Sequence, residues 1–87
     1  MSAVTLFTIP NCGECQAVKE FLQQQGVVWV EVDVAGSLAN LRRLRRLTDG
    51  RRVPVAAWQG EVVVGFDPGA LTALAKKVEA YQDDQRN

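Results

Sequence analysis

The chain has 87 residues, of which 47% are hydrophobic, a share that suits one small folded core and argues against disorder. Ten basic and ten acidic residues give a formal net charge of zero, so no overall field attracts the protein to nucleic acid or to a membrane surface. The sequence shows no signal-peptide pattern, and no apolar run approaches the ~20 residues of a membrane span. We therefore expect a single domain over residues 1–87 in the cytoplasm. A monomer is a separate expectation, which the motifs described below imply.

The first half of the chain has the pattern of a βαβ unit. Residues 4–9 are apolar and β-branched, which predicts a short strand buried on both faces, and Pro10 ends it. Residues 12–25 have apolar side chains at helical spacing, and Gly26 predicts the end of that helix. Residues 27–34 alternate acidic side chains with valines, as a second strand does. Two strands joined by a helix within about thirty residues should be parallel, with a right-handed crossover.

A second helix is expected over residues 38–48, with Gly36 as a break before it and Ser37 as its N-cap. Its leucines recur at every third position, so they drift about 60° per step around a 3.6-residue helix. Either the buried stripe is broad or the helix tightens locally. These leucines are Leu38, Leu41, Leu44 and Leu47.

The last part of the chain predicts a hairpin followed by a helix. Residues 53–58 and 61–64 have the composition of strands and are joined through Gln59-Gly60. Asp67-Pro68 predicts a cap and a proline at the first helical position. The polar segment 82–87 should fray. The inner face of this helix should carry Leu71, Leu74, Ala75, Val78 and Tyr81.

The only two cysteines form the motif Cys12-Gly13-Glu14-Cys15 at the predicted start of the first helix. A thiol at a helix N-terminus faces unpaired N–H groups and the positive end of the helix dipole, which favours the reactive thiolate. Cys15 lies one turn further on the same face, close enough to attack a mixed disulfide formed at Cys12. The motif predicts a redox dithiol with Cys12 attacking and Cys15 resolving.

Other interpretations of the two cysteines are less favoured. A structural disulfide between them would close a very small loop and remove little entropy from the unfolded chain. Zinc needs about four ligands, and the chain has no histidine and no third cysteine, so a zinc site would require two protomers. We therefore expect no metal. Two cysteines that merely pack in the core remain an alternative.

Three motifs, in this order and spacing, resemble the thioredoxin-fold redoxins, specifically the small glutaredoxin and NrdH-type redoxins, over nearly the whole chain. They are the cysteine pair after the first strand, Val53-Pro54 before the third, and Gly65-Phe66-Asp67-Pro68 before the last helix. The resemblance implies an α/β thioredoxin-like fold of order β-α-β-α-β-β-α. It also implies a four-stranded mixed sheet of strand order 2-1-3-4, with the first and third helices on one face and the second on the other.

The resemblance implies a dithiol-disulfide oxidoreductase that carries electrons to protein disulfides such as that of ribonucleotide reductase and receives them from thioredoxin reductase. No bound cofactor is expected besides the redox-active Cys12–Cys15 disulfide. One alternative is a glutathione-dependent glutaredoxin. An alternative of a different class is an iron–sulfur carrier or regulator, in which Cys12 binds a cluster shared between two protomers.

The resemblance also implies a substrate-binding segment. Redoxins of this type hold a cis proline beside the dithiol, at the position of Pro54, which would leave the backbone of Val53 to pair with an extended substrate. A proline that opens an edge strand is the plainer interpretation. Phe66 should fill the space that a second glycine leaves in glutaredoxins, and the pattern here is that of the NrdH type. Asp67 could instead meet the ammonium group of glutathione, and Arg51 or Arg52 could hold one of its carboxylates, although glutaredoxins usually have threonine where Arg52 stands.

The residues around the cysteines should modulate their reactivity. Asn11 precedes the pair, and Gly13 and Glu14 separate its two members. The charge of Glu14 should oppose the Cys12 thiolate, which would make the reduced form a stronger reductant. Residues 8–11 offer no charge, whereas glutaredoxins commonly have a lysine or arginine just before the first cysteine.

Six arginines gather within eleven positions in the middle of the chain. Those in the helix share the side away from most of the leucines, so a solvated helix face is the plain interpretation. An acidic docking partner or ligand carboxylate is the alternative. Nucleic acid is not expected, because no aromatic residues interleave with the arginines. The arginines are Arg42, Arg43, Arg45, Arg46, Arg51 and Arg52.

Overall fold

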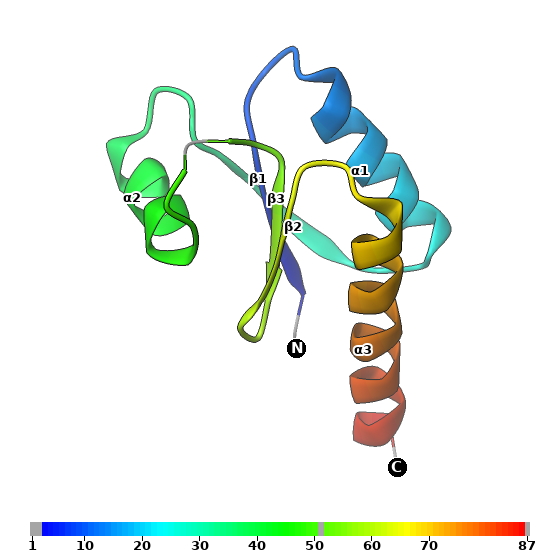
Figure 1. Ribbon diagram of the computed structural model, residues 1–87. Coiled ribbons are helices and arrows are strands. Elements are labelled where there is room, and N and C mark those ends of the chain that lie inside the picture. Colours follow the sequence, from blue (N-terminus) through cyan, green and yellow to red (C-terminus); the bar gives the residue numbers. More distant parts are fainter. Residues whose placement is uncertain (1–2, 51, 87) are drawn as a thin grey trace.

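The computed structural model describes residues 3–50 and 52–86 and contains the predicted elements in the predicted order (Figure 1). Most elements are one or two residues shorter than expected at an end. The strands are β1 (Val4–Thr8), β2 (Trp29–Asp33), β3 (Val55–Trp58) and β4 (Glu61–Val64). The helices are α1 (Gly13–Gln24), α2 (Leu38–Leu47) and α3 (Pro68–Arg86).

The four strands form one mixed sheet of order β2-β1-β3-β4. β1 pairs with β2 in parallel, from Val4 opposite Trp29 to Thr8 opposite Asp33, and it pairs with β3 in the antiparallel direction. β3 and β4 form the antiparallel hairpin. The parallel βαβ unit, the sheet order and the thioredoxin-like fold are therefore confirmed. β1 is an inner strand and is almost wholly buried, as predicted.

Helices cover both faces of the sheet (Figure 1). α1 and α3 share one face, where they pack with the sheet in the larger core cluster, and α2 covers the other face in a smaller cluster. Burial of the larger cluster supplies most of the hydrophobic stabilisation, since each fully buried aliphatic side chain contributes about 1.5–3 kcal/mol. Its members include Val18 and Leu22 of α1 and Leu71, Leu74, Ala75 and Val78 of α3.

α2 differs from the prediction. It is a regular α-helix, yet neither a broad stripe nor a local tightening is found, because Leu38 is 62% exposed and Leu47 is 41% exposed. Only Leu44 is fully buried, against Phe7 of β1 and its neighbours, and Leu41 is partly buried beside it. The helix therefore contacts the sheet through its middle. On the edge strand β2, the expected alternation likewise holds at Val32 but leaves Val30 exposed.

The turns before α3 follow the sequence signals. Gln59 and Gly60 have φ values of 44° and 84°, the left-handed pair that a two-residue hairpin requires. Asp67 caps α3, because its Oδ1 accepts a hydrogen bond from the Ala70 amide at 3.1 Å. α3 includes the polar segment up to Arg86, and the fraying of that segment stays a prediction. The ring of Tyr81 packs edge-on against Trp58, with centroids 5.6 Å apart, and ties the later turns to the sheet.

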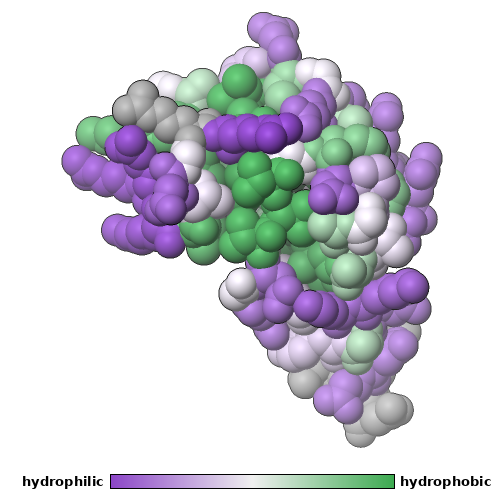
Figure 2. Space-filling model, in the orientation of Figure 1, coloured by the Kyte–Doolittle hydropathy of each residue, from purple (hydrophilic) through white to green (hydrophobic). Residues whose placement is uncertain are grey.

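Figure 2, in the orientation of Figure 1, shows an apolar area at the centre of this face with strongly hydrophilic side chains on the α2 side. Apolar residues exposed on or near the edge strand β4 include Val62, Val64 and Phe66. Among the described helices, none is both long and apolar enough to cross a membrane.

Candidate functional site

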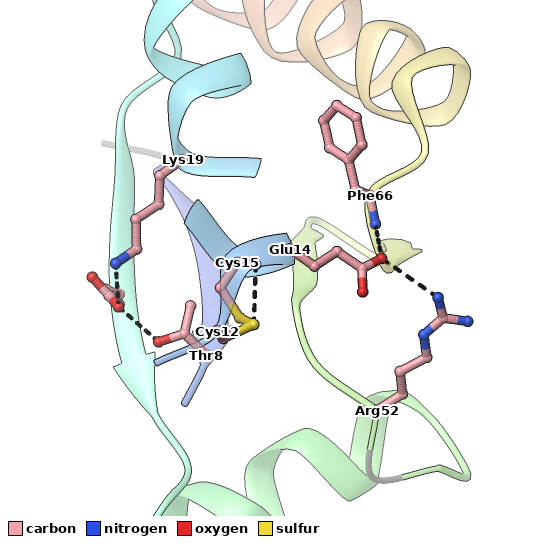
Figure 3. The surroundings of a disulfide bond; sticks show 8 residues. Thr8, Cys12, Glu14, Cys15, Lys19, Arg52 and Phe66 are labelled. Carbon is pink, nitrogen blue, oxygen red and sulfur yellow. Dashed lines mark hydrogen bonds and ion pairs between the residues drawn. A yellow bond between two sulfur atoms is a disulfide. The ribbon is translucent and has the colours of Figure 1, made fainter. Parts of the chain in front are cut away.

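Cys12 and Cys15 form a disulfide at the N-terminus of α1 (Figure 3). Cys12 is the N-cap residue, with extended backbone, and its Sγ accepts a hydrogen bond from the Cys15 amide at 3.0 Å. Asn11, just before it, has a φ of 58°, in the left-handed region that asparagine tolerates better than most residues. This turn returns the chain from the end of β1, and it places the first cysteine against free amides of the helix.

The two cysteines differ in accessibility. Cys15 is 2% exposed and belongs to the core, whereas Cys12 is only partly buried. The inward position expected for Cys15 is therefore found. Because an external sulfur or a substrate disulfide can approach Cys12 alone, the geometry favours Cys12 as the attacking residue and Cys15 as the resolving one.

A hydrogen-bonded carboxylate lies on the β2 side of the disulfide (Figure 3). The buried Thr8 donates its hydroxyl proton to Oε2 of Glu31 at 2.7 Å, and Nζ of Lys19 contacts the same oxygen at 2.8 Å. These two donors hold the pKa of Glu31 below its usual value, Lys19 more than Thr8. Lys19, Glu31 and Thr8 also line the hollow beside the disulfide. This group could not be predicted from the sequence, because its members come from three elements, β1, α1 and β2.

The peptide bond between Val53 and Pro54 is cis, as the resemblance implied. Pro54 is buried, and its carbonyl accepts a hydrogen bond from the Gly65 amide at 2.8 Å. Within the described residues, no hydrogen bond involves the backbone of Val53, which lies just before β3. The role of this segment in substrate binding stays a prediction.

Glu14 points away from the disulfide and links three segments (Figure 3). Its Oε2 accepts a hydrogen bond from the Phe66 amide at 2.7 Å and contacts Nη2 of Arg52 at 3.4 Å. The arginine that departs from the glutaredoxin pattern therefore has a carboxylate partner, which the sequence did not predict. The expectation that Glu14 opposes the Cys12 thiolate treated its charge as unpaired, and here that charge is partly compensated.

The remaining predicted residues, Phe66 and Asp67, lie in the segment just before α3. The ring of Phe66 packs edge-on against Phe21 of α1, with centroids 6.1 Å apart, so the side chain is turned toward the dithiol helix. The carboxylate of Asp67 is engaged in capping α3. Phe66 also contacts Glu14 through its amide, whereas Gly13 is exposed at the first turn of α1.

The arginine group divides between the two faces of the sheet. Arg52 contacts Glu14 near the dithiol, whereas the arginines of α2 lie on the opposite side (Figure 1). The guanidinium of Arg43 lies over the Phe7 ring, 5.8 Å from its centroid, and Arg42, Arg45 and Arg46 are exposed. Arg51 lies outside the described residues. Within 3–50 and 52–86, no group of three or more histidine, cysteine, aspartate or glutamate side chains is placed to hold a metal ion.

Comparisons with known proteins agree with this geometry. The family model for glutaredoxin matches residues 4–63. An uncharacterized glutaredoxin-like 8.6 kDa protein in the rubredoxin operon of Clostridium pasteurianum is 28% identical over 74 residues, which cover 85% of this chain and 99% of that protein.

Two solved structures have the same fold. A mutant of the thioredoxin-like protein BC3987 is 35% identical, with a TM-score of 0.75 over 82% of this chain and 96% of that one. The NrdH-redoxin of Escherichia coli, described as a glutaredoxin-like protein with a thioredoxin-like activity profile, is 24% identical, with a TM-score of 0.73 over 83% of this chain and 93% of that one.

Proposed function

Because the chain belongs to the glutaredoxin family, we propose that it is an NrdH-redoxin-like carrier, which reduces protein disulfides and is itself reduced by thioredoxin reductase. The family and the Cys12–Cys15 pair make the protein a thiol-disulfide oxidoreductase. The observation that carries the direction of the chemistry is the contrast between the accessible Cys12 at the helix N-terminus and the buried Cys15 one turn behind it.

The reaction follows from that contrast. In the reduced protein, the Cys12 thiolate attacks one sulfur of the substrate disulfide, an S–S bond to Cys12 forms, and the first substrate thiolate leaves and takes a proton from solvent. The Cys15 thiol loses its proton to solvent and attacks Sγ of Cys12. The second substrate thiolate then leaves and is protonated. The substrate gains two electrons and two protons, and the Cys12–Cys15 disulfide is the oxidised product.

Amides at the start of α1 favour the attacking form of Cys12. In the disulfide, the Cys15 amide already donates to Sγ of Cys12 at 3.0 Å. A thiolate at the same position would accept this bond as a charge-assisted one, which is stronger than its neutral counterpart. The negative charge would also lie at the positive end of the helix dipole.

Two features support thioredoxin reductase rather than glutathione as the electron source. Residues 8–11, before the attacking cysteine, contain no basic residue that could bind a glutathione carboxylate. In addition, the Phe66 ring occupies space beside α1 that a second glycine would leave open. The likeness to NrdH-redoxin motivates ribonucleotide reductase as a substrate. A reducing cytoplasm is the compartment we propose, since dithiols of this kind turn over there.

One observation favours a second candidate, a glutathione-dependent glutaredoxin. The side chain of Arg52 is 65% exposed beside the dithiol helix, and a guanidinium there could bind a ligand carboxylate. The two candidates differ in their electron source, so one assay separates them.

The test is NADPH-coupled reduction of a protein disulfide with each reducing system supplied separately. We expect rapid turnover with thioredoxin reductase and little with glutathione and glutathione reductase. The reduction potential should lie nearer thioredoxin's roughly −270 mV than the roughly −200 to −230 mV of glutaredoxins. Robust deglutathionylation with glutathione as the sole donor, together with no reaction with thioredoxin reductase, would contradict the proposal and favour the glutaredoxin.

A further inference from the structure

The carboxylate of Glu14 occupies a position where two anion-binding groups converge (Figure 3). The Phe66 amide donates to Oε2 at 2.7 Å, and the Arg52 guanidinium contacts the same oxygen at 3.4 Å. A backbone N–H and a guanidinium are the donors that proteins use to bind the carboxylates of ligands. Here these donors bind a side chain of the protein itself.

Gly65 forms the floor of this position. It is buried and has a φ of +76°, and a Cβ atom at this residue would lie 2.9 Å from both Nη2 of Arg52 and Oε2 of Glu14. The ion pair therefore lies directly over the Gly65 backbone, and a Cβ atom at residue 65 would make the ends of these two side chains move. The Gly65 amide is bound in turn to the Pro54 carbonyl at 2.8 Å, which joins the floor to the Val53-Pro54 segment. The carboxylate position is thus part of the packed structure.

This position lies next to the reactive sulfur along the chain. Glu14 lies between Cys12 and Cys15 in the first turn of α1, so its carboxylate and the donors bound to it belong to the same end of the helix as the reactive sulfur. A small thiol joined to Cys12 through a disulfide has flexible polar arms that can extend around this end of the helix to those donors. If that thiol carried a carboxylate, the nearby donors for it would be the Phe66 amide and Arg52. Both already have a carboxylate partner.

We propose that Glu14 is an internal competitor for carboxylate-bearing small thiols, such as glutathione, and so directs the protein toward protein disulfides. This inference rests on the proposed function in taking Cys12 as the attacking cysteine. A ligand carboxylate must first displace Glu14, and its apparent dissociation constant rises in inverse proportion to the fraction of molecules in which the donors are vacant.

A ligand carboxylate can displace the Glu14 carboxylate from the Phe66 amide and Arg52. The Glu14 side chain is 39% exposed and that of Arg52 is 65% exposed, so solvent screens their ion pair, and the short amide hydrogen bond is the stronger contact. Glu14 should therefore weaken the binding of such a ligand without abolishing it. Removing its carboxylate should strengthen binding by about tenfold.

The test uses S-methylglutathione, which has both glutathione carboxylates but, as a thioether, cannot exchange with the disulfide. Binding to the oxidised protein is followed through the backbone amide resonance of Phe66 in ¹⁵N-labelled samples. Glu14→Ala should lower the dissociation constant about tenfold relative to the unaltered protein. Glu20→Ala is the matched control, because Glu20 is an exposed carboxylate on the same helix, and it should change nothing.

Two further variants locate the effect. Glu14→Ala combined with Arg52→Ala should lose most of the gained affinity, because the guanidinium is then absent. Glu14→Gln preserves the shape of the side chain and can still accept from the Phe66 amide, so it should show a smaller gain than Glu14→Ala. If Glu14→Ala folds poorly, Glu14→Gln replaces it in the binding measurement.

Equal binding by the unaltered protein and both Glu14 variants would overturn the inference, as would a gain that persists without Arg52. This measurement involves no electron transfer. Its failure would leave the electron-donor proposal intact, and a failure of the donor assay would leave the binding result standing.

Discussion

The amide of Cys15 donates a hydrogen bond to Sγ of Cys12 across 3.0 Å, so the resolving residue also supplies a donor to the attacking one. The buried Cys15 is fixed by the core, and the partly exposed Cys12 lies against the first turn of α1. The two cysteines therefore have different environments, and replacing one should affect disulfide reduction differently from replacing the other.

Cys12→Ser should abolish disulfide reduction, because the accessible member of the cysteine pair is removed. Cys15→Ser should still attack the substrate but should stop at the mixed disulfide, since no thiol remains to resolve it. Mass spectrometry of the reduced variants mixed with a disulfide substrate would detect the trapped adduct. Activity retained in Cys12→Ser and lost in Cys15→Ser would reverse the assignment.

Replacing each member of the Glu14–Arg52 pair should shift the Cys12 thiol in opposite directions. Glu14→Gln removes a negative charge near the thiolate, so the pKa of the Cys12 thiol should fall and the reduction potential should become less negative. Arg52→Gln leaves Glu14 without its cation and should raise that pKa. Thiolate absorbance against pH measures both effects. An unchanged pKa in both variants would show that neither charge reaches Cys12, and shifts of the same sign would show that something other than charge causes them.

Glu31→Gln should destabilise the protein at neutral pH and much less in acid. Lys19 and Thr8 lower the pKa of Glu31, so its carboxylate contributes stability above the pKa of the unfolded chain and loses it as the pH falls through the folded pKa. The side chain is 43% exposed, so the loss should stay below about 1 kcal/mol.

Urea midpoints of Glu31→Gln and the unaltered protein, compared at about pH 7 and about pH 3, measure the difference. It should shrink in acid. Glu20→Gln, a carboxylate with no contact to either Lys19 or Thr8, should show no such pH dependence. A difference that stayed constant with pH would mean that the ionised form of Glu31 is not what stabilises the fold.

Gly65→Ala and Gly26→Ala should cost similar stability but differ at the site. Both glycines have left-handed backbone, with φ values of 76° and 70°, which costs an alanine about 1 kcal/mol. Only at Gly65 would the new Cβ meet the ends of the Glu14 and Arg52 side chains, and these can move aside. The Nε–H resonance of the Arg52 side chain should therefore change in Gly65→Ala and not in Gly26→Ala, and an unchanged resonance in both variants would contradict the contact.

Leu44→Ala should destabilise the protein by about 2–5 kcal/mol, the usual cost of emptying a buried leucine site. Leu38→Ala, on the same helix but 62% exposed, should cost less than about 0.5 kcal/mol. Chemical denaturation of both variants would test the finding that α2 packs through its middle. Equal losses of stability in the two variants would contradict this finding and support a broad buried stripe on α2.

The elements and their order could be predicted from the sequence because the signals for them are local. Hydrophobic periodicity, the Gln59-Gly60 turn and the Asp67 cap each lie within a few residues. The strand order and the cis bond before Pro54 followed from the resemblance, since no local pattern indicates either.

Contacts between distant segments could not be predicted in this way. Glu14 meets Arg52 across 38 positions and Phe66 across 52, and Thr8 meets Glu31 across 23. None of these contacts produces a periodic pattern in the sequence from which it could be predicted. The exposure of Leu38 and Leu47 could not be predicted for a related reason. The spacing of leucines defines one face of the helix, but it does not show how much of that face the sheet covers.

The register of the sheet has a practical consequence for spectroscopy. Trp29 pairs with Val4 at the start of β1, and Trp58 follows Ala57, which pairs with Thr5, so both indoles lie at the end of the sheet remote from Thr8 and the disulfide. These are the only tryptophans of the chain, and β1 separates them from the sulfurs by about 3.3 Å per residue. Disulfide quenching of indole emission requires close approach. Intrinsic fluorescence should therefore report unfolding equally well in the oxidised and reduced protein, and should be a poor indicator of redox state.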